Sequence, residues 1–404
     1  MPTFEEARKI ILAGISPLGV ERVTLLESLG RVIAEEMIAP WDMPLYDNSA
    51  MDGFGVRAPS GTEPAALKIT GYIPAGGIAA SEVIPGCAVK IMTGAPIPPG
   101  CDAVVPVEET EEENGMVRIL KPVFRHQHIR FKGEDVAAGD TVIAAGTVMR
   151  PPGISMLASF GKVIVPVYRR ARVAILSTGD ELIELGEPIT SGRIINSNAL
   201  SLAASIKEIG AEPVILGIAR DNRESHVEKM VEGLNADALI TSAGVSAGDR
   251  DLVRECLAEL GVRQVFWKVG IKPGGPTAFS MSGGKPVFSL PGNPVSTMIT
   301  FEELVRPALL KMMGHRKVIR PLVKVTLAEE VRKKPGKVHF LRVRLTMGKG
   351  GYLASTSGDQ NTGILKTMLQ ADALVILPAD STSFAAGEEV DAHILNETVA
   401  MEEG

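Results

Sequence analysis

The sequence has few cysteines and no long apolar run. Its three cysteines, Cys87, Cys101 and Cys256, are widely spaced among 404 residues and form no Cys-x-x-Cys pair. This spacing argues against a disulfide framework and against a zinc site. No apolar run approaches the roughly 20 residues needed to cross a bilayer. Residues 1–6 lack the basic start of a signal peptide, and no apolar stretch follows them. We therefore expect a cytoplasmic protein that does not enter a membrane.

Positive charge is not in excess either. The chain has 42 Lys and Arg against 48 Asp and Glu, a net charge of −6, so it has no general attraction for nucleic acid. An anionic substrate would need local positive charge. Aromatic residues make up only 4%, whereas Gly (42) and Pro (27) are plentiful, which is typical of short strands and tight turns. The chain is too long for one core, because domains usually span about 100–200 residues.

The first part of the chain predicts helices around a β-rich insertion. Apolar spacing predicts helices over 4–15 and 25–38. Between about 40 and 139, short β-rich runs alternate with Gly/Pro turns, which predicts a small inserted β-rich domain. A short helix is expected to begin at Pro151 and run toward Phe160.

From Arg172 onward, expected strands alternate with expected helices. The expected strands are 173–176, 213–216, 238–241 and 286–290, and the expected helices are 199–209, 224–234, 251–260 and 294–313. This alternation predicts a mostly parallel sheet covered on both faces, with ligands beyond the carboxyl ends of its strands. After Pro321, short strands at 323–327, 338–345 and 373–377 predict a compact C-terminal β domain.

Small and charged residues follow every strand of this α/β unit. These segments are 177–181, 219–222, 241–251 and 290–294. Asn293 is a plausible N-cap with Pro294 in the first helical turn, and such helix starts suit phosphate or another anion. Neither glycine-bearing loop is a Walker A loop or a GxGxxG fingerprint, which argues against an ATPase and an NAD enzyme.

Three carboxylates and two lysines are expected at the same edge. Glu181, Asp221 and Asp251 would repel one another unless they share a cation. Oxygen ligands in this number suit Mg²⁺, which often bridges to substrate phosphates. Lys268 and Lys272 are four residues apart on an expected extended segment, so both would point to one side and neutralise a polyanion. Taken one by one, the acids also fit solvated helix starts, and the lysines also fit an ordinary surface.

Seven segments in order resemble the molybdopterin molybdenumtransferase family, which includes the C-terminal domain of gephyrin. They are 47–53 (Asp-Asn-Ser-Ala-Met-Asp-Gly), 92–95, 133–135, 177–182, 244–248, 271–274 and 290–296. The resemblance implies an elongated homodimer of four-domain subunits, in which the α/β domain of one subunit faces the inserted domain of the other. On this resemblance we divide the chain into an N-terminal helix (1–20), a helical linker domain (21–45 and 140–170), an inserted β-rich domain (46–139), a molybdopterin-binding α/β domain (171–319) and a C-terminal β-barrel-like domain (320–404).

The resemblance also implies site residues. The family's catalytic positions fall on Asp52, Thr93, Asp135, Glu181, Asp221, Asp251, Lys268 and Lys272, with Mg²⁺ held by Glu181, Asp221 and Asp251. Positions that contact the pterin nucleotide fall on Thr178, Gly179, Asp180, Ser197, Gly244, Val245, Ser246, Gly248, Pro273, Gly274, Pro291, Gly292, Asn293 and Pro294. Arg342 and Ser357 in the C-terminal domain resemble contacts to molybdate.

Two positions depart from the family pattern. The family often has Lys-Pro-Gly-Lys-Pro, and its second lysine is associated with molybdate, whereas Gly275 stands at that position here. Ala243 replaces the first glycine of the family's Gly-Gly-Val-Ser.

The expected function is insertion of molybdate into adenylylated molybdopterin, with Mg²⁺ gripping the phosphoanhydride and AMP released. Three alternatives stay open. One is tungstate insertion. A second is adenylyl transfer to molybdopterin, which would not need the extra β domains. The third is a non-catalytic scaffold, which would not need the acids. The expected partners are a second copy of the chain and, transiently, the molybdopterin adenylyltransferase.

Overall fold

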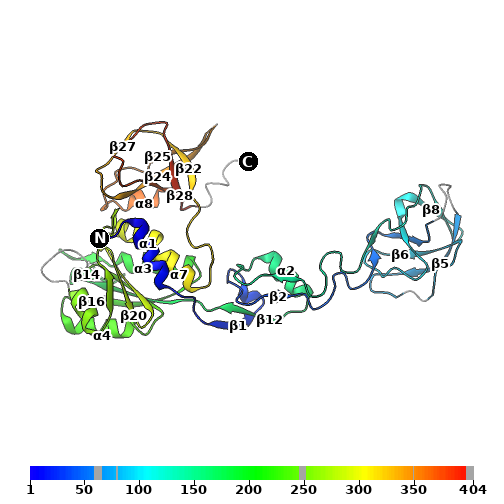
Figure 1. Cartoon of the computed structure of the whole chain (residues 1–404), viewed down its shortest axis with the longest axis horizontal. Coiled ribbons are helices and arrows are strands. Elements are labelled where there is room, and N and C mark those ends of the chain that lie inside the picture. Colours follow the sequence, from blue (N-terminus) through cyan, green and yellow to red (C-terminus); the bar gives the residue numbers. More distant parts are fainter. Residues whose placement is uncertain (59–65, 79–80, 245–251, 349, 397–404) are drawn as a thin grey trace. The chain divides into compact units, whose positions relative to one another are not determined.

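The computed structural model describes residues 1–58, 66–78, 81–244, 252–348 and 350–396 (Figure 1). The chain divides into two compact units. The first comprises residues 1–34, 146–149 and 165–404, and the second comprises 35–145 and 150–164. Within the described ranges, no helix combines the length and the apolar character that a membrane span requires.

The second unit contains a six-stranded sheet in the order β7-β4-β6-β5-β9-β8. The strands are β4 (Gly53–Val56), β5 (Ala66–Ile73), β6 (Cys87–Ile91), β7 (Ala103–Pro106), β8 (Thr110–Glu113) and β9 (Met116–Ile119). Position 53 must be glycine, because a Cβ there would lie 2.0 Å from the Val105 carbonyl oxygen on the neighbouring strand. Phe54 and Val117 lie in the buried core. The predicted inserted β-rich domain is confirmed.

Shorter elements complete this unit. They are β2 (Met37–Ile38) paired with β11 (Thr141–Ile143), β3 (Asn48–Ser49) paired with β10 (Ile129–Arg130), the 3₁₀ turn η2 (Val107–Glu109) and helix α2 (Pro151–Ser159). Helix α2 begins with proline in its first turn, as predicted, because proline there loses no hydrogen bond. Its C-terminal neighbour Phe160 packs edge-on against Trp41.

The first unit begins with helix α1 (Phe4–Gly14), which confirms the first predicted helix. A capping box starts it: the Thr3 hydroxyl accepts from Glu6 N–H (3.2 Å), and Thr3 N–H donates to Glu6 Oε2 (2.9 Å). Phe4, Ala7 and Ile11 form its buried face.

The predicted helix over 25–38 is wrong. The structure has only the 3₁₀ turn η1 (Leu26–Ser28) and then extended chain. Gly30 adopts a left-handed φ of 74°, which ends helical geometry, and β-branched Val32 and Ile33 form isolated bridges with residues 148 and 167. Strand β1 (Val20–Thr24) pairs with β12 (Ile164–Tyr168).

The α/β domain is built on a six-stranded sheet in the order β16-β13-β17-β21-β20-β18. The strands are β13 (Arg172–Thr178), β16 (Glu212–Ala219), β17 (Ala238–Ser242), β18 (Arg263–Phe266), β20 (Ala278–Ser282) and β21 (Lys285–Leu290). The four predicted strands are the parallel ones. The sequence analysis did not predict β18 and β20, which add an antiparallel edge. A small pair, β14 (Leu182–Ile183) and β15 (Ile194–Ile195), lies outside this sheet.

Helices cover both faces of this sheet. They are α3 (Ser197–Glu208), α4 (Arg223–Gly233), α5 (Leu252–Glu259), α6 (Pro294–Thr300) and α7 (Arg306–Met312). Alternate residues of β13 belong to different cores: Val173 and Ile175 pack with α1, α3, α6 and α7, and Ala174 and Leu176 pack with α4 and α5. The single helix expected over 294–313 is interrupted by a π-helical segment, η3 (Phe301–Val305).

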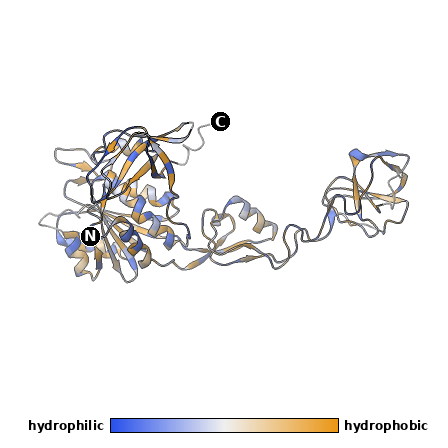
Figure 2. Cartoon of the chain, turned by 45° about the horizontal axis from the view of Figure 1, so that its top comes forward, coloured by the Kyte–Doolittle hydropathy of each residue, from blue (hydrophilic) through white to orange (hydrophobic). Residues whose placement is uncertain are grey.

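The C-terminal domain is a closed five-stranded barrel. Its strands are β22 (Val323–Leu327), β24 (Val338–Gly348), β25 (Gly351–Thr356), β26 (Ala373–Leu377) and β28 (Glu389–Ile394). The barrel closes because β24 pairs with both β25 and β26. Figure 2 shows hydrophobic residues along these strands. Small elements β23 (Val331–Arg332), β27 (Ser383–Phe384) and α8 (Lys366–Leu369) complete the domain. The two-residue strand β19 (Ile271–Lys272) pairs with β24 and joins the barrel to the α/β domain.

One ion pair fixes the start of the parallel sheet. Arg169 donates two hydrogen bonds to Asp237 (3.0 and 2.7 Å), and Arg172 N–H donates a third (2.8 Å). Burial alone would raise the pKa of Asp237, but the hydrogen bonds from Arg169 and Arg172 outweigh it and the pKa is lowered. Because the folded-state pKa is depressed, this stabilisation is complete above the ordinary carboxyl pKa of about 3.9 and is lost as the pH falls through the folded value.

We therefore predict that Asp237→Ala lowers the free energy of unfolding at pH 7 by about 2–3 kcal/mol, since charged hydrogen bonds are lost. The control is Asp391→Ala, which breaks the solvent-exposed Lys324–Asp391 pair and should cost less than about 1 kcal/mol. Urea denaturation at pH 7 and pH 3 measures both. Equal losses for the two variants, or a loss for Asp237→Ala that does not shrink at pH 3, would contradict the assignment.

Candidate functional site

The loops that follow the four parallel strands surround one cavity of about 550 Å³, which we call the carboxyl-edge cavity. Its lining residues are Thr178, Gly179, Glu181, Asp221, His226, Ala243, Gly244, Leu252, Val253, Pro276, Pro291, Gly292, Asn293 and Ser296. Eight of these were predicted from the sequence: Thr178, Gly179, Glu181, Asp221, Gly244, Pro291, Gly292 and Asn293. The parallel arrangement therefore brings together residues that lie more than a hundred positions apart in the chain.

The cavity holds two carboxylates, and its described lining includes no lysine or arginine. Glu181 and Asp221 are both exposed. Asp180, which was also predicted, links their two loops: its N–H donates to Asp221 Oδ2 (3.4 Å), and its Oδ1 accepts from Asp221 N–H (3.2 Å). Arg220 holds the same turn by donating to the Leu182 carbonyl (2.9 Å). Two carboxylates are thus held at one cavity without a cationic side chain among its described lining.

Two positions in this cavity require glycine. Gly179 has a φ of 137°, and a Cβ there would lie 2.4 Å from Glu181 Oε2. Gly244 has a φ of 73°, and a Cβ there would lie 2.3 Å from a methyl carbon of Val253. A side chain at either position would be strained and would displace these neighbours, so both glycines set the shape of the cavity wall.

Two asparagines that sequence reasoning missed hold the strand ends together. Asn196 caps α3, and its Oδ1 also accepts from the Ser177 hydroxyl (2.8 Å). Asn198 donates from Nδ2 to Ser242 Oγ (2.9 Å) and to the Gly292 carbonyl (2.8 Å). The only available sequence signal was the polar run Asn-Ser-Asn at the start of a helix, and that run does not reveal which strands it touches.

Asn293 has a different role from the one predicted. It occupies the N-cap position of α6, but its side chain does not cap the helix. Its Nδ2 donates instead to Thr362 Oγ1 in the barrel (3.1 Å), and its Oδ1 is buried without a hydrogen-bond partner in the described structure. Pro294 and Ser197 line a different, apolar cavity beside α8, so the structure does not bring them to the carboxyl-edge cavity.

A second cavity, of about 520 Å³, contains the predicted residues Lys272 and Pro273; we call it the lysine cavity. Its lining residues are Lys272, Pro273, Glu329, Glu330, Val331, Arg332, Lys333, Lys334, His339, Phe340, Leu341, Thr356, Gln360, Thr362 and Leu377. Thr362 lines this cavity and accepts the hydrogen bond from Asn293, which lines the carboxyl-edge cavity. The two cavities therefore adjoin at the Asn293–Thr362 contact.

The expectation that Lys268 and Lys272 share one side of a single strand is wrong. Strand β18 ends at Phe266, and β19 contains only Ile271 and Lys272. The bend between them removes the two-residue periodicity on which the expectation rested. Lys268 lines neither cavity, and Gly274 also lines neither.

Arg342 and Ser357 are buried beneath the loop that contributes Gln360 and Thr362 to the lysine cavity. The Arg342 guanidinium donates to the carbonyls of Asp359 (3.3 Å) and Asn361 (3.4 Å), and its Nε has no hydrogen-bond partner among the described residues. Burial lowers the pKa of Arg342, and Asp359 opposes that shift. The Ser357 hydroxyl lies within hydrogen-bond distance of the Arg342 carbonyl (3.2 Å). Neither residue is part of the cavity lining, whereas Gln360 and Thr362 from the same loop are.

The remaining predicted residues lie in the second unit or outside the described ranges. Thr93 donates from its backbone N–H and its hydroxyl to Asp52 Oδ1 (2.7 Å each), which lowers the pKa of Asp52. Asp135 is exposed, and its backbone N–H donates to the Met43 carbonyl (3.1 Å). Four predicted residues, Val245, Ser246, Gly248 and Asp251, lie outside the described residues. Among those that are described, no three His, Cys, Asp or Glu side chains form a metal-binding group.

Comparisons with known proteins cover almost the whole chain. Residues 2–161 match the MoeA N-terminal region (domain I and II), 174–311 match a probable molybdopterin binding domain, and 324–395 match the MoeA C-terminal region (domain IV). The molybdopterin molybdenumtransferase of Staphylococcus aureus is 34% identical over 405 residues, covering 99% of this chain and 96% of that protein. The one from Haemophilus influenzae is 35% identical, covering 98% and 99%.

The chain belongs to the molybdopterin molybdenumtransferase family. It is therefore a member of a family of enzymes. The crystal structure of the molybdopterin biosynthesis moeA protein from Pyrococcus horikoshii is similar throughout, with a TM-score of 0.84, 31% identity and coverage of 98% of this chain and 100% of that one. The described lining of the carboxyl-edge cavity lies in the segment that matches the probable molybdopterin binding domain. Most of the lining of the lysine cavity lies in the segment that matches the MoeA C-terminal region.

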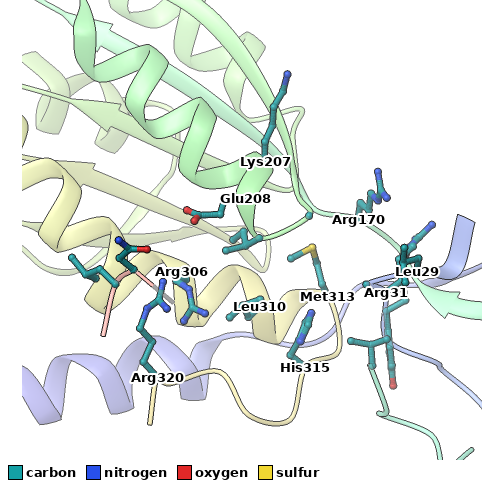
Figure 3. A pocket seen from close by; sticks show the side chains of 17 residues that line it. Leu29, Arg31, Arg170, Lys207, Glu208, Arg306, Leu310, Met313, His315 and Arg320 are labelled. Carbon is teal, nitrogen blue, oxygen red and sulfur yellow. The ribbon is translucent and has the colours of Figure 1, made fainter. Parts of the chain in front are cut away.

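A third cavity, of about 530 Å³, lies at the amino edge of the parallel sheet and contains none of the residues expected from the family resemblance (Figure 3). Several cationic side chains line it, but some of them already form ion pairs within the protein. Arg306 and Arg320 share Glu302 (3.5 and 2.5 Å), and Arg31 pairs with Glu21. Figure 3 shows Arg306 and Arg320 beside each other. We interpret this network as a structural junction between the helices and the chain that enters β13.

We predict that Asn198→Ala lowers the free energy of unfolding by about 1–3 kcal/mol, because its part-buried hydrogen bond to Ser242 and its exposed hydrogen bond to Gly292 are both lost. It should also speed amide hydrogen exchange in residues 290–294, since the Gly292 carbonyl loses its anchor. The matched control is Asn235→Ala, an exposed asparagine with one long hydrogen bond (3.3 Å), expected to cost less than about 1 kcal/mol. Unchanged exchange in 290–294 would show that Asn198 does not hold that loop.

Proposed function

We propose that this enzyme inserts molybdenum from molybdate into adenylylated molybdopterin and releases AMP in a Mg²⁺-dependent reaction. The observation that carries the proposal is a pair of adjoining cavities that differ in charge. The described lining of one has two carboxylates and no lysine or arginine, and the lining of the other has three lysines and an arginine against two glutamates. A nucleotide phosphoanhydride with its metal suits the first cavity, and an oxyanion suits the second. Their contact at Asn293–Thr362 supports the idea that the two substrates meet there.

The residues of the carboxyl-edge cavity fit Mg²⁺. Glu181 and Asp221 present carboxylate oxygens, which this ion prefers, and no lysine or arginine competes for them in the described lining. Asp251, which lies outside the described residues, would be the third ligand. When bound, the ion would neutralise charge on the phosphoanhydride oxygens. The chain contributes the positioning: Gly179 leaves room for the Glu181 carboxylate, and the reciprocal Asp180–Asp221 hydrogen bonds hold the second loop.

Charge separation explains why two cavities are needed. Two unit charges of like sign 4 Å apart repel by about 4 kcal/mol at an effective dielectric constant of 20. A molybdate dianion beside Glu181 and Asp221 would therefore be unstable without a cation. In the lysine cavity, Lys272, Lys333 and Lys334 form no salt bridge with any described residue, and Lys333 Nζ donates to the backbone carbonyls of Lys337 (3.2 Å) and Ala379 (3.5 Å), so their positive charges can act on an oxyanion. Tungstate has the same charge and nearly the same size, so this geometry does not select between the two.

The proposal includes a homodimer in which the second unit of one subunit completes the carboxyl-edge cavity of the other. What supports it is the Asp52–Thr93 pair: it is exposed, and two hydrogen bonds keep Asp52 ionised and oriented. Such preorganisation is expected of a group that acts on a ligand. We also propose that the adenylylated substrate arrives through transient contact with the molybdopterin adenylyltransferase.

The first test removes the carboxylates. Glu181→Gln and Asp221→Asn should each lower the rate of AMP release from adenylylated molybdopterin with molybdate and Mg²⁺ by about 100-fold or more, because the charge that faces the metal is lost. The control, Glu212→Gln, changes an exposed acid at the opposite end of β16 and should keep wild-type activity. A Glu181→Gln protein with a normal fold and wild-type AMP release would overturn the catalytic assignment. Repeating the assay with tungstate measures oxyanion preference.

The second test addresses the shared site. Differently tagged Glu181→Gln and Asp52→Asn subunits are co-expressed, and the doubly tagged heterodimer is purified. Each variant should be inactive as a homodimer, whereas the heterodimer should recover about half of wild-type activity, because one of its two sites has both residues intact. An inactive heterodimer would place both residues in the site of one subunit, and failure to isolate any dimer would reject the shared site.

A further inference from the structure

Lys337 lies beside Gly275, the glycine that stands where the family often has a lysine. A Cβ built on Gly275 would be 3.4 Å from Lys337 Nζ and 3.2 Å from the Ile271 carbonyl oxygen. Gly275 does not have the left-handed backbone that would require glycine. A side chain at position 275 would therefore begin in the space beside the Lys337 ammonium group.

The backbone fixes Lys337 at this place. It lies directly before β24, whose first residues pair with β19 in the register Ile271↔Val338 and Lys272↔His339. Val338 N–H donates to the Gly270 carbonyl (3.0 Å), and Val269 N–H donates to the Gly275 carbonyl (3.0 Å). The register between the two domains thus determines which barrel residue lies opposite Gly275.

Four lysines near this point carry positive charge; Asp380 acts on Lys333 electrostatically but forms no salt bridge with it. Lys272, Lys333, Lys334 and Lys337 form no salt bridge with a described residue. Burial lowers the pKa of His339 to about 4, and Lys333, Lys272 and Lys337 add to the shift, in that order. His339 is therefore neutral at pH 7. Several ammonium groups near one another are unfavourable unless an anion lies among them.

The acids of the lysine cavity offset this charge only in part, because its lining has four basic side chains (Lys272, Arg332, Lys333 and Lys334) against two carboxylates (Glu329 and Glu330). Glu330 pairs with Arg332 (2.6 Å), and Glu329 accepts hydrogen bonds from the N–H and hydroxyl of Thr356 (3.0 and 2.5 Å). Lys333 Nζ donates to the Lys337 carbonyl (3.2 Å), which links the two lysines through the backbone. Lys337 does not itself line the cavity, but it lies in sequence between Lys334 and His339, which both do.

We infer that Lys337 binds the oxyanion substrate, taking the place of a lysine at position 275. The ligand class is a tetrahedral dianion, of which molybdate is the member that the proposed function requires. The inference rests on that proposed function and adds a residue to its site. It differs from the site expected from the sequence in that the barrel, and not the segment after β19, provides the second ammonium group beside Lys272.

Equilibrium binding of molybdate to the full-length protein tests this inference without any turnover. Lys337→Ala should weaken binding by about tenfold, the effect of one charge-assisted hydrogen bond. Gly275→Lys alone should not tighten binding, because two ammonium groups would compete for one space. The double variant Gly275→Lys/Lys337→Ala should return to within about threefold of wild type. Lys317→Ala, an exposed lysine outside both cavities, is the matched control.

The outcomes distinguish a failure of the proposed function from a failure of the role of Lys337. A wild-type protein that binds neither molybdate nor tungstate overturns the proposed function and, with it, this role of Lys337. If wild type binds and Lys272→Ala weakens binding while Lys337→Ala does not, only the role of Lys337 is overturned. A double variant that binds as weakly as Lys337→Ala, with an unchanged thermal unfolding midpoint, also overturns the inference that one lysine replaces the other.

Discussion

The pairing of β19 with β24 is the constraint on which the candidate site depends. This pairing involves only two residues of the α/β domain, yet it sets the register between that domain and the barrel. Around it, Phe4 of α1 packs edge-on against Phe340 of β24, so the same junction is held by buried apolar surface as well as by hydrogen bonds. The Asn293–Thr362 hydrogen bond then forms at the point where the two cavities meet. A shift of one residue in the pairing would turn His339 of β24 to the opposite face and move Lys337, directly before it, away from Gly275.

The sequence predicted the parallel sheet well, and the reason is physical. A strand buried on both faces must be apolar at every position, so runs such as Val173–Leu176 stand out between amphipathic helices. The carboxyl ends of such strands lie on one edge whatever their order, so Glu181 and Asp221 could be placed together without knowledge of the topology. The antiparallel strands β18 and β20 were not predicted, because β18 includes charged and amide residues and β20 ends in Ser-Met-Ser.

The features that the sequence could not predict depend on contacts between distant segments. The helix expected over 25–38 failed because Val32 and Ile33 find extended partners more than 100 residues away, a tertiary preference that local propensity does not contain. Lys268 and Lys272 were assigned to one strand because spacing alone cannot reveal a bend. Asn198 and Lys337 are single polar residues that matter through contacts with distant segments: Asn198 with Ser242 and Gly292, and Lys337 with the space beside Gly275. Arg342 was expected to contact molybdate directly, yet its observed hydrogen bonds are to the loop that lines the cavity.

Separate placement of the carboxylates and the lysines leaves both sets free to bind a ligand. The carboxylates and the lysines would attract one another strongly if they shared one cavity, and they would then satisfy each other and leave neither for a ligand. The structure keeps them apart with neutral residues: Asn293 and Thr362 stand between the two sets and bond to each other. Because Asn293 Oδ1 remains buried without a hydrogen-bond partner in the described structure, this boundary keeps one free acceptor. A buried acceptor of this kind is costly unless a donor reaches it. The boundary between the two cavities therefore contains one strained position, because the Asn293–Thr362 hydrogen bond is made at the cost of an unsatisfied Asn293 Oδ1.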